Sequence, residues 1–530
     1  MTLPRLMPHE SEKSAERAAA ARTDCVLLAV YAPFGTDETL SNYPNSQPQP
    51  LTQHPLVRNL QKVAMLGVHV SALIDRVGED TYLIEIPAGA PERMCITSAW
   101  KEDMSSPLTL AGFLRRAHHN HPSAALVLAL EGHGAGFLPD IDRTKMTAKN
   151  ITDDGRIEWK VSSSNSPALP EVSPILPEVS PILPEVSPIL PANHMPMSTW
   201  GLADALRRAQ SAGVCKVAVL HLNNCFNMSV ELLHTVAPYA HVATGYINYN
   251  FFTAGDTYPW VFGKLAQPGG LTALALAQTF ADGNDQFLAA KGNHPTVGGV
   301  VVLSRMEGIS QAIDKLARAL LDAMRNAGAQ RPAVILKIKK AIKDARQVDT
   351  PNGGGFDLDV PDEMTDIRSL ALMLKDRDAD FSPVPVAQAA QTLVDALKGI
   401  WRYGAHDEPW IDTTVDWDFS NDDMAMNILL PDPELKGLWD WRSPFYMDNK
   451  PDPNAPKVQP HIIDFLQATK WVEFIDEYHK DVKFVGLLSA KIPEFPIFNV
   501  KFVPPEKPPY DPGKPPTYGK PDQTKGCKGA

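Results

Sequence analysis

The sequence has few cysteines and no motif built on pairs of them. Its 530 residues include 5 cysteines, and no two of them form a CxxC pair. This spacing argues against a zinc ribbon and against a thioredoxin-type redox site. So few cysteines also fit a reducing compartment, in which each one is either a packed side chain or a reactive thiol.

Long apolar runs and a basic excess are also absent. No stretch of eighteen or more apolar residues occurs, and the polar, alanine-rich residues 1–22 lack the apolar core of a secretory signal. We therefore expect a cytoplasmic protein without direct membrane insertion. The formal net charge of -12 and the pI near 5.7 give no sign of a basic patch, so nucleic acid is not an expected partner.

Several common catalytic signatures are missing as well. Neither GxSxG nor HExxH occurs, which argues against a serine-hydrolase elbow and against a zincin. Gly132, Gly134 and Gly136 resemble half of a phosphate loop, but no GK[ST] follows them, so nucleotide binding is not expected. The three histidines within residues 118–121 could bind zinc, although a polar helix end is the simpler interpretation.

What the sequence does contain, from residue 25 to about 303, is an alternation of short apolar runs and amphipathic stretches. The runs predict strands at 26–32, 68–74, 81–86, 124–130, 216–222 and 297–303. Helical spacing predicts helices at 108–119, 202–209 and 309–320. Because continuous apolar runs that alternate with helices are typical of a parallel sheet covered on both faces, we expect an α/β/α sandwich around a mostly parallel sheet.

Composition divides the rest of the chain. After the lead-in at 1–22, we expect the α/β domain at 23–345, interrupted by a proline-rich insertion at 146–197 in which LPEVSPI occurs three times, from residue 169 to 189. Proline at every third or fourth position excludes helices and sheet ladders, so the repeats are expected to form an exposed, extended segment. Residues 346–502 predict an α+β extension, and the Pro-, Lys- and Gly-rich tail at 503–530 is expected to be disordered.

Two of the predicted strands lead directly into reactive side chains. The run 124–130 is followed by Glu-Gly-His-Gly with His133, and the run 216–222 by Asn-Asn-Cys with Cys225. Because sites gather at the carboxyl ends of parallel strands, His133 and Cys225 would emerge at one edge if these strands are neighbours. An imidazole beside a thiol lowers its pKa and moves protons, which is the chemistry of a cysteine nucleophile with a general base.

The surroundings of both residues fit this hypothesis. The segment after Cys225 has helical character, and a cysteine at a helix N-terminus has its thiolate stabilised by the macrodipole. Backbone N–H groups of Gly134 and Cys225 could hold the oxyanion of an acyl-transfer intermediate. The ordinary interpretation is that a histidine after a strand lies on the surface and that an intracellular cysteine is a packed side chain without a catalytic role.

At these residues the sequence resembles the clostripain-like cysteine peptidases, a branch of the caspase-like clan. The resemblance is carried by 26–31, 70–76, 123–137 with its Gly-His-Gly element, 220–228 with its Asn-Asn-Cys element and 243–260. It continues more weakly through 300–309, 427–431 and 471–478. It implies a caspase-like fold and a cysteine endopeptidase with a protein substrate, in which Cys225 attacks the scissile carbonyl, His133 transfers the proton and a thioester forms.

The same resemblance points to a binding pocket. The family has Asp two residues before the nucleophile, where it helps to bind a basic side chain, but this chain has Asn223. Asn can donate and accept hydrogen bonds but cannot neutralise a cation. Asp256 matches a second acidic position of the pocket. We therefore expect substrate binding by Asn223 and Asp256 and cleavage after Arg or Lys.

The family often matures by self-cleavage in the loop after the catalytic histidine. In this chain that loop contains Arg143, Lys145 and Lys149, so we hypothesise that residues 140–197 form a cleavable or movable lid; an inert loop of variable length is the alternative. Some members are activated by calcium, but no EF-hand loop or dense acidic cluster here would require it, so we expect no cofactor, with calcium as the alternative.

Three functional hypotheses follow from the sequence. The first is an active endopeptidase. The second is an inactive caspase-like scaffold that binds partners through its insertion and tail, which Asn223 leaves open. The third is a clan enzyme dedicated to one regulatory target, for instance a pore-forming effector clipped in bacterial defence.

Overall fold

A nine-stranded sheet forms the centre of the molecule, with strand order β14-β12-β10-β9-β6-β2-β3-β4-β5. The computed structural model describes residues 22–23, 25–35, 38–44, 47–76, 81–100, 104–140, 146–151, 157–161, 197–250, 252–265, 271–290, 297–348, 363–376, 381, 384–403, 407–409, 416–418, 424–430, 442–447, 459–480 and 491–492. The sheet strands are β2 (Val26–Pro33), β3 (His69–Asp75), β4 (Thr81–Ile86), β5 (Cys95–Trp100), β6 (Ala125–Glu131), β9 (Val217–Asn223), β10 (Ala240–Tyr246), β12 (Gly298–Val302) and β14 (Trp401–Tyr403).

The middle of this sheet is parallel and its edges are antiparallel. The pairs β3–β2, β2–β6, β6–β9 and β9–β10 are parallel, whereas β4, β5, β12 and β14 pair with antiparallel neighbours. The six strands predicted from apolar runs are all present. The run near residue 300 forms an antiparallel strand, β12, at the edge of the parallel block.

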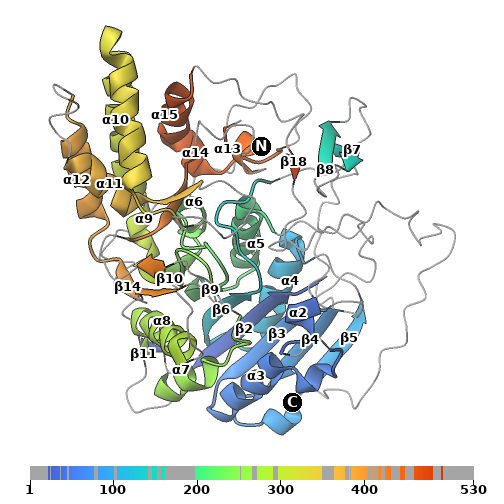
Figure 1. The fold of residues 1–530 in the computed structure, drawn as a ribbon. Helices are drawn as coiled ribbons and strands as arrows, with labels where there is room; N and C mark the ends of the chain where they lie inside the picture. Colours follow the sequence, from blue (N-terminus) through green and yellow to red (C-terminus); the bar gives the residue numbers. More distant parts are fainter. Residues whose placement is uncertain are drawn as a thin grey trace.

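Helices cover both faces of the sheet, which explains why its central strands are mostly apolar (Figure 1). In β2, Leu27, Ala29 and Tyr31 join one buried cluster, and Leu28 and Val30 join the other. The first cluster includes residues of α4 (Pro107–Asn120), α5 (Thr199–Ser211), α6 (Val230–Val236) and α9 (Met306–Arg325). The second includes α3 (Pro55–Met65), α7 (Tyr258–Leu265) and α8 (Ala273–Ala290). The predicted α/β/α sandwich around a mostly parallel sheet is confirmed.

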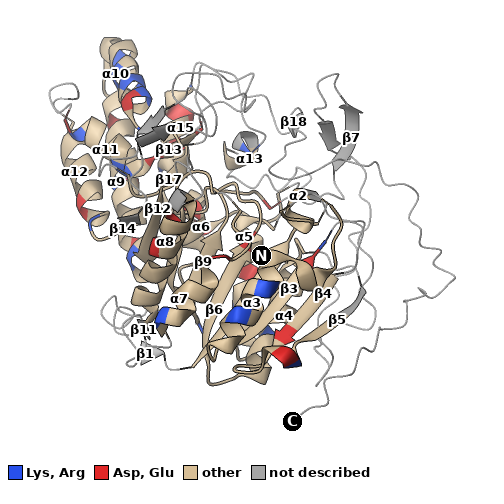
Figure 2. Ribbon diagram, turned by 60° about the horizontal axis from the view of Figure 1, so that its bottom comes forward, with Lys and Arg blue, Asp and Glu red and all other residues tan. Residues whose placement is uncertain are grey.

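Charged side chains lie mainly on the helices. Figure 2 shows the central strands largely without Lys, Arg, Asp or Glu, whereas α3 and α10 (Arg331–Asp344) carry several basic residues. Among the described helices, none is long and apolar enough to cross a membrane. Shorter elements are β1 (Arg22–Thr23), α2 (Glu38–Ser41), η1 (Leu51–Gln53), η2 (Pro91–Arg93), β11 (Leu271–Thr272), η4 (Leu303–Arg305) and η5 (Gly328–Gln330).

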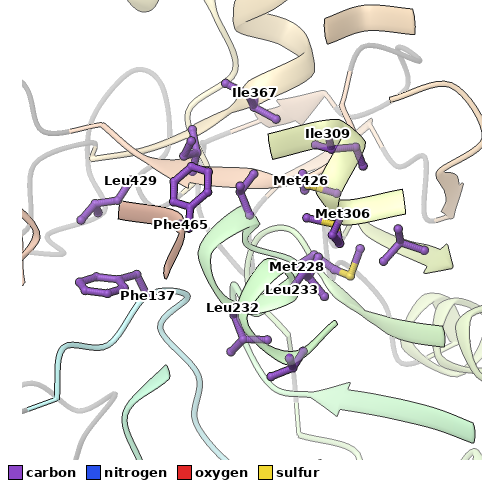
Figure 3. Packing of buried hydrophobic residues seen from close by; sticks show 14 of the residues in the cluster. Phe137, Met228, Leu232, Leu233, Met306, Ile309, Ile367, Met426, Leu429 and Phe465 are labelled. Carbon is purple, nitrogen blue, oxygen red and sulfur yellow. The ribbon is translucent and has the colours of Figure 1, made fainter. Parts of the chain in front are cut away.

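The C-terminal region shares the core of the α/β domain. Its strands are β13 (Met364–Asp366), β15 (Asp407–Pro409), β16 (Asp416–Asp418) and β17 (Asn427–Leu429), and its helices are α11 (Ile367–Lys375), α12 (Val386–Ala396), α13 (Ser443–Met447), α14 (Asp464–Ala468) and α15 (Trp471–Tyr478). Figure 3 shows Met426, Leu429 and Phe465 of this region packed with Met228 and Leu233. Since β14 also extends the main sheet, this extension is built into the domain.

Part of the predicted insertion is ordered as strands. β7 (Met146–Ile151) and β8 (Ile157–Val161) form an antiparallel pair, and β18 (Lys491–Ile492) joins them. Leu138 and Thr199 bring the two ends of the insertion together: Thr199 N–H donates to the Leu138 carbonyl (3.0 Å), and Leu138 N–H to Thr199 Oγ1 (2.9 Å). The LPEVSPI repeats and the 503–530 tail lie outside the described residues.

Candidate active site

Two neighbouring parallel strands carry the two predicted catalytic residues at their carboxyl ends. β6 and β9 pair in parallel, with Glu131 opposite Asn223 in the register. His133 follows Glu131 by two residues, and Cys225 follows Asn223 by two residues. Because the register ends both strands at the same level, the histidine and the cysteine leave the sheet at one edge, as the sequence predicted.

The loop that carries His133 lies directly against the loop that carries Cys225. A Cβ atom built on Gly134 would lie 2.3 Å from the carbonyl oxygen of Cys225 and 3.0 Å from its nitrogen. No side chain fits there, so only glycine allows the two backbones to approach this closely. On either side Gly132 and Gly136 have φ of 104° and 66°, and His133 between them is exposed at the surface.

The thiol of Cys225 is held by backbone groups. Asn250 N–H donates to Cys225 Sγ at 3.3 Å, and the thiol faces the Asn250 carbonyl oxygen at 3.4 Å. Burial raises the pKa of the Cys225 thiol to about 11, against hydrogen bonds from the backbone N–H groups of Asn250, Cys225 and Gly134. The two N–H groups predicted to form an oxyanion hole thus both approach the sulfur, and the resting residue is a neutral thiol.

One prediction about Cys225 is wrong. The sequence placed it at a helix N-terminus, but α6 begins at Val230, five residues later, with Ser229 as its cap. The chain first turns through Phe226, whose φ of 60° is left-handed and cannot start a helix. Because the dipole effect fades within the first turn, it does not lower the pKa of this thiol.

Behind the two loops lies a buried hydrogen-bonded chain that the sequence did not reveal. The Tyr258 hydroxyl donates to Glu131 Oε1, and Asn223 Nδ2 donates to Glu131 Oε2 at 2.9 Å. Asn250 Nδ2 in turn donates to Asn223 Oδ1 at 3.1 Å. Burial raises the pKa of Glu131 to about 7, although both hydrogen bonds oppose it. A carboxylate that ends an otherwise apolar strand was the available signal.

The two predicted substrate-binding residues differ in their surroundings. Asn223 is 2% exposed and has both ends of its amide engaged, so its contact with substrate stays a prediction. Asp256 is partly exposed in the loop between β10 and α7, where its Oδ1 accepts from Asn59 Nδ2 at 2.8 Å. Since β10 pairs with β9, Asp256 lies at the same edge of the sheet as Cys225.

The C-terminal region fixes the loops from the other side. Asn427 Nδ2 donates to the carbonyl oxygens of Phe226 (2.8 Å) and Ile247 (2.6 Å), so one buried side chain ties the turn after Cys225 to the end of β10. The buried Arg442 guanidinium donates to the Ala135 carbonyl in the histidine loop. The resemblance reached residue 427 but gave it no role.

The structure describes one of the three residues predicted as self-cleavage positions. Arg143 and Lys145 lie outside the described residues, and Lys149 lies in β7, so self-cleavage stays a prediction. Within the described part of the chain, no group of three potential metal ligands occurs. Cys25, Cys215 and Cys225 are free thiols. The cytoplasmic location also stays a prediction.

Comparisons with known proteins gave structural matches alone. No family model and no curated protein matches the chain. A secreted C11 cysteine protease from Bacteroides thetaiotaomicron is 10% identical, with 77% of this chain and 94% of that chain covered and a TM-score of 0.45. A second structure is that of a secreted C11 cysteine protease from the same organism in complex with an irreversible peptide inhibitor. It is 12% identical, with 85% of this chain and 99% of that chain covered and a TM-score of 0.47.

A third match is an inactive zymogen C11 protease from Parabacteroides distasonis. It is 11% identical, with 85% of this chain and 99% of that chain covered and a TM-score of 0.47. All three are cysteine proteases, the kind of enzyme that the sequence resembles. At TM-scores below 0.5 the likeness does not establish the function of this chain, for which the geometry of the site is the evidence.

Proposed function

We propose that this chain is a cysteine endopeptidase with Cys225 as nucleophile and His133 as general base. The observation that carries the proposal is the contact between Gly134 and the backbone of Cys225, which joins the histidine loop to the cysteine loop at the carboxyl ends of β6 and β9. A nucleophile, a base on the adjacent loop and converging backbone donors are the parts that acyl transfer requires.

The reaction follows from these parts. Cys225 Sγ bonds to the scissile carbonyl carbon while its proton moves to His133, and the N–H groups of Gly134 and Cys225 donate to the oxyanion. His133 then gives the proton to the leaving amine as the C–N bond breaks, leaving a thioester. Water attacks the thioester carbonyl while His133 takes one of its protons. His133 returns this proton to Cys225 Sγ as the C–S bond breaks, which restores the thiol and releases the product as a carboxylic acid.

The raised pKa of Cys225 has a consequence for this mechanism. With a pKa of about 11, the resting thiol is protonated near neutral pH. The proton therefore leaves as the bond to substrate forms, and the nucleophile is not a standing thiolate. Reagents that attack any low-pKa thiol should react slowly with Cys225, whereas peptide electrophiles that occupy the site should react fast.

Asp256 supports a preference for Arg or Lys before the cut. It is acidic, partly exposed and at the same sheet edge as the nucleophile, so a cationic substrate side chain could approach it. Asn223 remains part of this proposal as a neighbouring hydrogen-bonding group. Cleavage of a peptide library tests the preference, and enrichment of acidic or apolar residues before the cut would contradict it.

We extend the proposal to processing and role. Arg143, Lys145 and Lys149 are the proposed self-cleavage positions, and a cytoplasmic role in bacterial defence, with a pore-forming effector as target, rests on the resemblance alone. Intact mass spectrometry of the wild-type chain and Cys225→Ala tests processing. Fragments that end at these residues in the wild-type protein alone would support it, and an intact wild-type chain would reject it.

An inactive scaffold is the second candidate, because a pKa raised to about 11 leaves the Cys225 thiol neutral at rest. A chloromethyl ketone on a short peptide ending in Arg separates the two. In a Cys25→Ser background, which removes an exposed free thiol, a peptidase is labelled at Cys225 and loses labelling with His133→Ala. A scaffold shows no labelling of Cys225 above that of Cys215.

A further inference from the structure

Glu131 sits at the origin of the hydrogen-bonded chain behind the nucleophile. Both of its oxygens accept: Oε1 from the Tyr258 hydroxyl, and Oε2 from Asn223 Nδ2 at 2.9 Å. The side chain is 1% exposed, so solvent does not compete for these positions. A carboxylate that accepts at both oxygens leaves Asn223 a single orientation, with its amide nitrogen toward Glu131 and its oxygen away from it.

That orientation passes on to the thiol. Asn223 Oδ1 accepts from Asn250 Nδ2 at 3.1 Å, which places the Asn250 backbone beside Cys225. The Asn250 N–H donates to Cys225 Sγ at 3.3 Å, and its carbonyl oxygen lies 3.4 Å from the sulfur. Each link of this chain pairs a donor with an acceptor, so reversing the Asn223 amide would leave two acceptors face to face at Glu131 and two donors face to face at Asn250.

We propose that Glu131 is a positioning residue for the nucleophile, acting through Asn223 and Asn250 to hold the backbone that binds Cys225 Sγ. The inference rests on the proposed peptidase and assigns Asn223 a task at the back of the site. It also explains the residue type at 223. Asp at this position would put a second carboxylate within hydrogen-bonding distance of Glu131, where two negative charges repel.

The groups that face Glu131 make it sensitive to pH. Its pKa is raised to about 7 by burial, while the Tyr258 hydroxyl on α7 and the Asn223 amide on β9 both favour its ionised form. Below that pKa the carboxyl carries a proton, which competes for one of the two acceptor positions. The chain should therefore be fully formed above pH 7 and weakened below it.

Exchanging the two side chains tests the proposal. In Asn223→Asp the two carboxylates face each other, and the defect should grow as the pH rises from 6 to 8.5, because a shared proton is lost. In the double variant Asn223→Asp with Glu131→Gln, the introduced glutamine amide can donate to the new carboxylate and its oxygen can accept from Tyr258. Asn250 keeps its acceptor, so every hydrogen bond has a counterpart in the double variant.

The readout is the rate of Cys225 alkylation by iodoacetamide in the Cys25→Ser background, mapped by peptide mass spectrometry, with Cys215 in the same molecule as reference. We expect Asn223→Asp and Glu131→Gln each to slow Cys225 alkylation about tenfold at pH 8, the size expected for losing a buried hydrogen bond, and the double variant to recover within about threefold. Cys215 rates and thermal midpoints show whether each variant is folded.

Two results would overturn the inference. One is alkylation of Cys225 at the wild-type rate in both single variants, and the other is alkylation in the double variant that is no faster than in the slower single variant. Because alkylation needs no peptide substrate, this outcome is independent of the peptidase assignment. If the wild type cleaves peptides, kcat should follow the same pattern with little change in KM. If it cleaves none, the proposed function fails while the alkylation test of Glu131 still stands.

Discussion

Two free cysteines lie at opposite ends of the same strand, β9, and each has a histidine nearby in the fold. Cys215 precedes the strand, and its Sγ lies 3.8 Å from the Nδ1 of His118. Cys225 follows the strand, next to the loop of His133. Burial raises the pKa of both thiols. Neither the residue pair nor the pKa therefore distinguishes the two ends.

Backbone N–H groups approach the sulfur at both ends of the strand. At Cys215 these are the N–H groups of Leu126 and of Cys215 itself, and at Cys225 they are those of Asn250, Cys225 itself and Gly134, which belongs to the histidine loop. Cys225 also lies at the carboxyl edge of the parallel strands, where loops converge, whereas Cys215 lies at the opposite edge. The sheet edge and the donor from the histidine loop, more than the Cys–His pairing or backbone donors in general, therefore mark the candidate nucleophile.

Replacing each thiol by a hydroxyl should produce the largest difference in peptide cleavage between the two ends of β9. Cys225→Ser should lower peptide cleavage by at least about a thousandfold, because the nucleophile itself is removed. Cys215→Ser should cleave at the wild-type rate. Initial rates on a fluorogenic Arg peptide measure both, and equal losses in the two variants would abolish the distinction between the two ends.

Adding one methyl group at the contact between the loops should have the next largest effect. Gly134→Ala puts a Cβ at 2.3 Å from the Cys225 carbonyl oxygen, so the histidine loop must move away and kcat should fall about a hundredfold. Gly308→Ala in α9 is the control, because no atom lies within 4 Å of its Cβ. Full activity in Gly134→Ala would show that the close approach is dispensable.

The pH dependence of the free energy of unfolding should distinguish the buried Glu131 carboxyl from ordinary surface carboxyls. Folding raises the pKa of Glu131 from 4.5 to about 7, so between these values the unfolded state gives up a proton that the folded state keeps. Stability should therefore fall as pH rises through this window, by up to about 3 kcal/mol at pH 8. In urea titrations at pH 5 and 8, Glu131→Gln should lack this loss; parallel curves would contradict it.

The smallest effect is expected at the edge of the site. Asp256→Asn keeps the acceptor for Asn59 but removes the charge, and should lower kcat/KM for Arg and Lys peptides about tenfold. Peptides with an apolar residue before the cut provide the matched control and should be unaffected. An equal loss on both kinds of peptide would point to a structural role for Asp256 instead of charge recognition.

The sequence predicted the scaffold of this site better than its interior. Apolar runs mark β6 and β9 because strands buried on both faces exclude polar side chains, so the strand ends and their His and Cys were readable. The start of α6 was not, because Phe226 is held in a left-handed turn by Asn427, which lies 201 residues further along the chain. Glu131 was missed because the partners that give it a role come from β9 and α7, which only folding brings to it.

The hydrogen bonds between the two ends of the insertion have a consequence for the evolution of its length. Leu138 and Thr199 bond to each other, and Ser198 Oγ donates to Asp140 at 3.1 Å, so both anchor points stay in place whatever length of chain runs between them. The entropy of closing a loop grows only logarithmically, by about 0.6 kcal/mol for each doubling of length. Replication slippage that adds or deletes one seven-residue LPEVSPI unit therefore changes the free energy of closing this loop very little. Tandem duplications can accumulate in this segment for that reason.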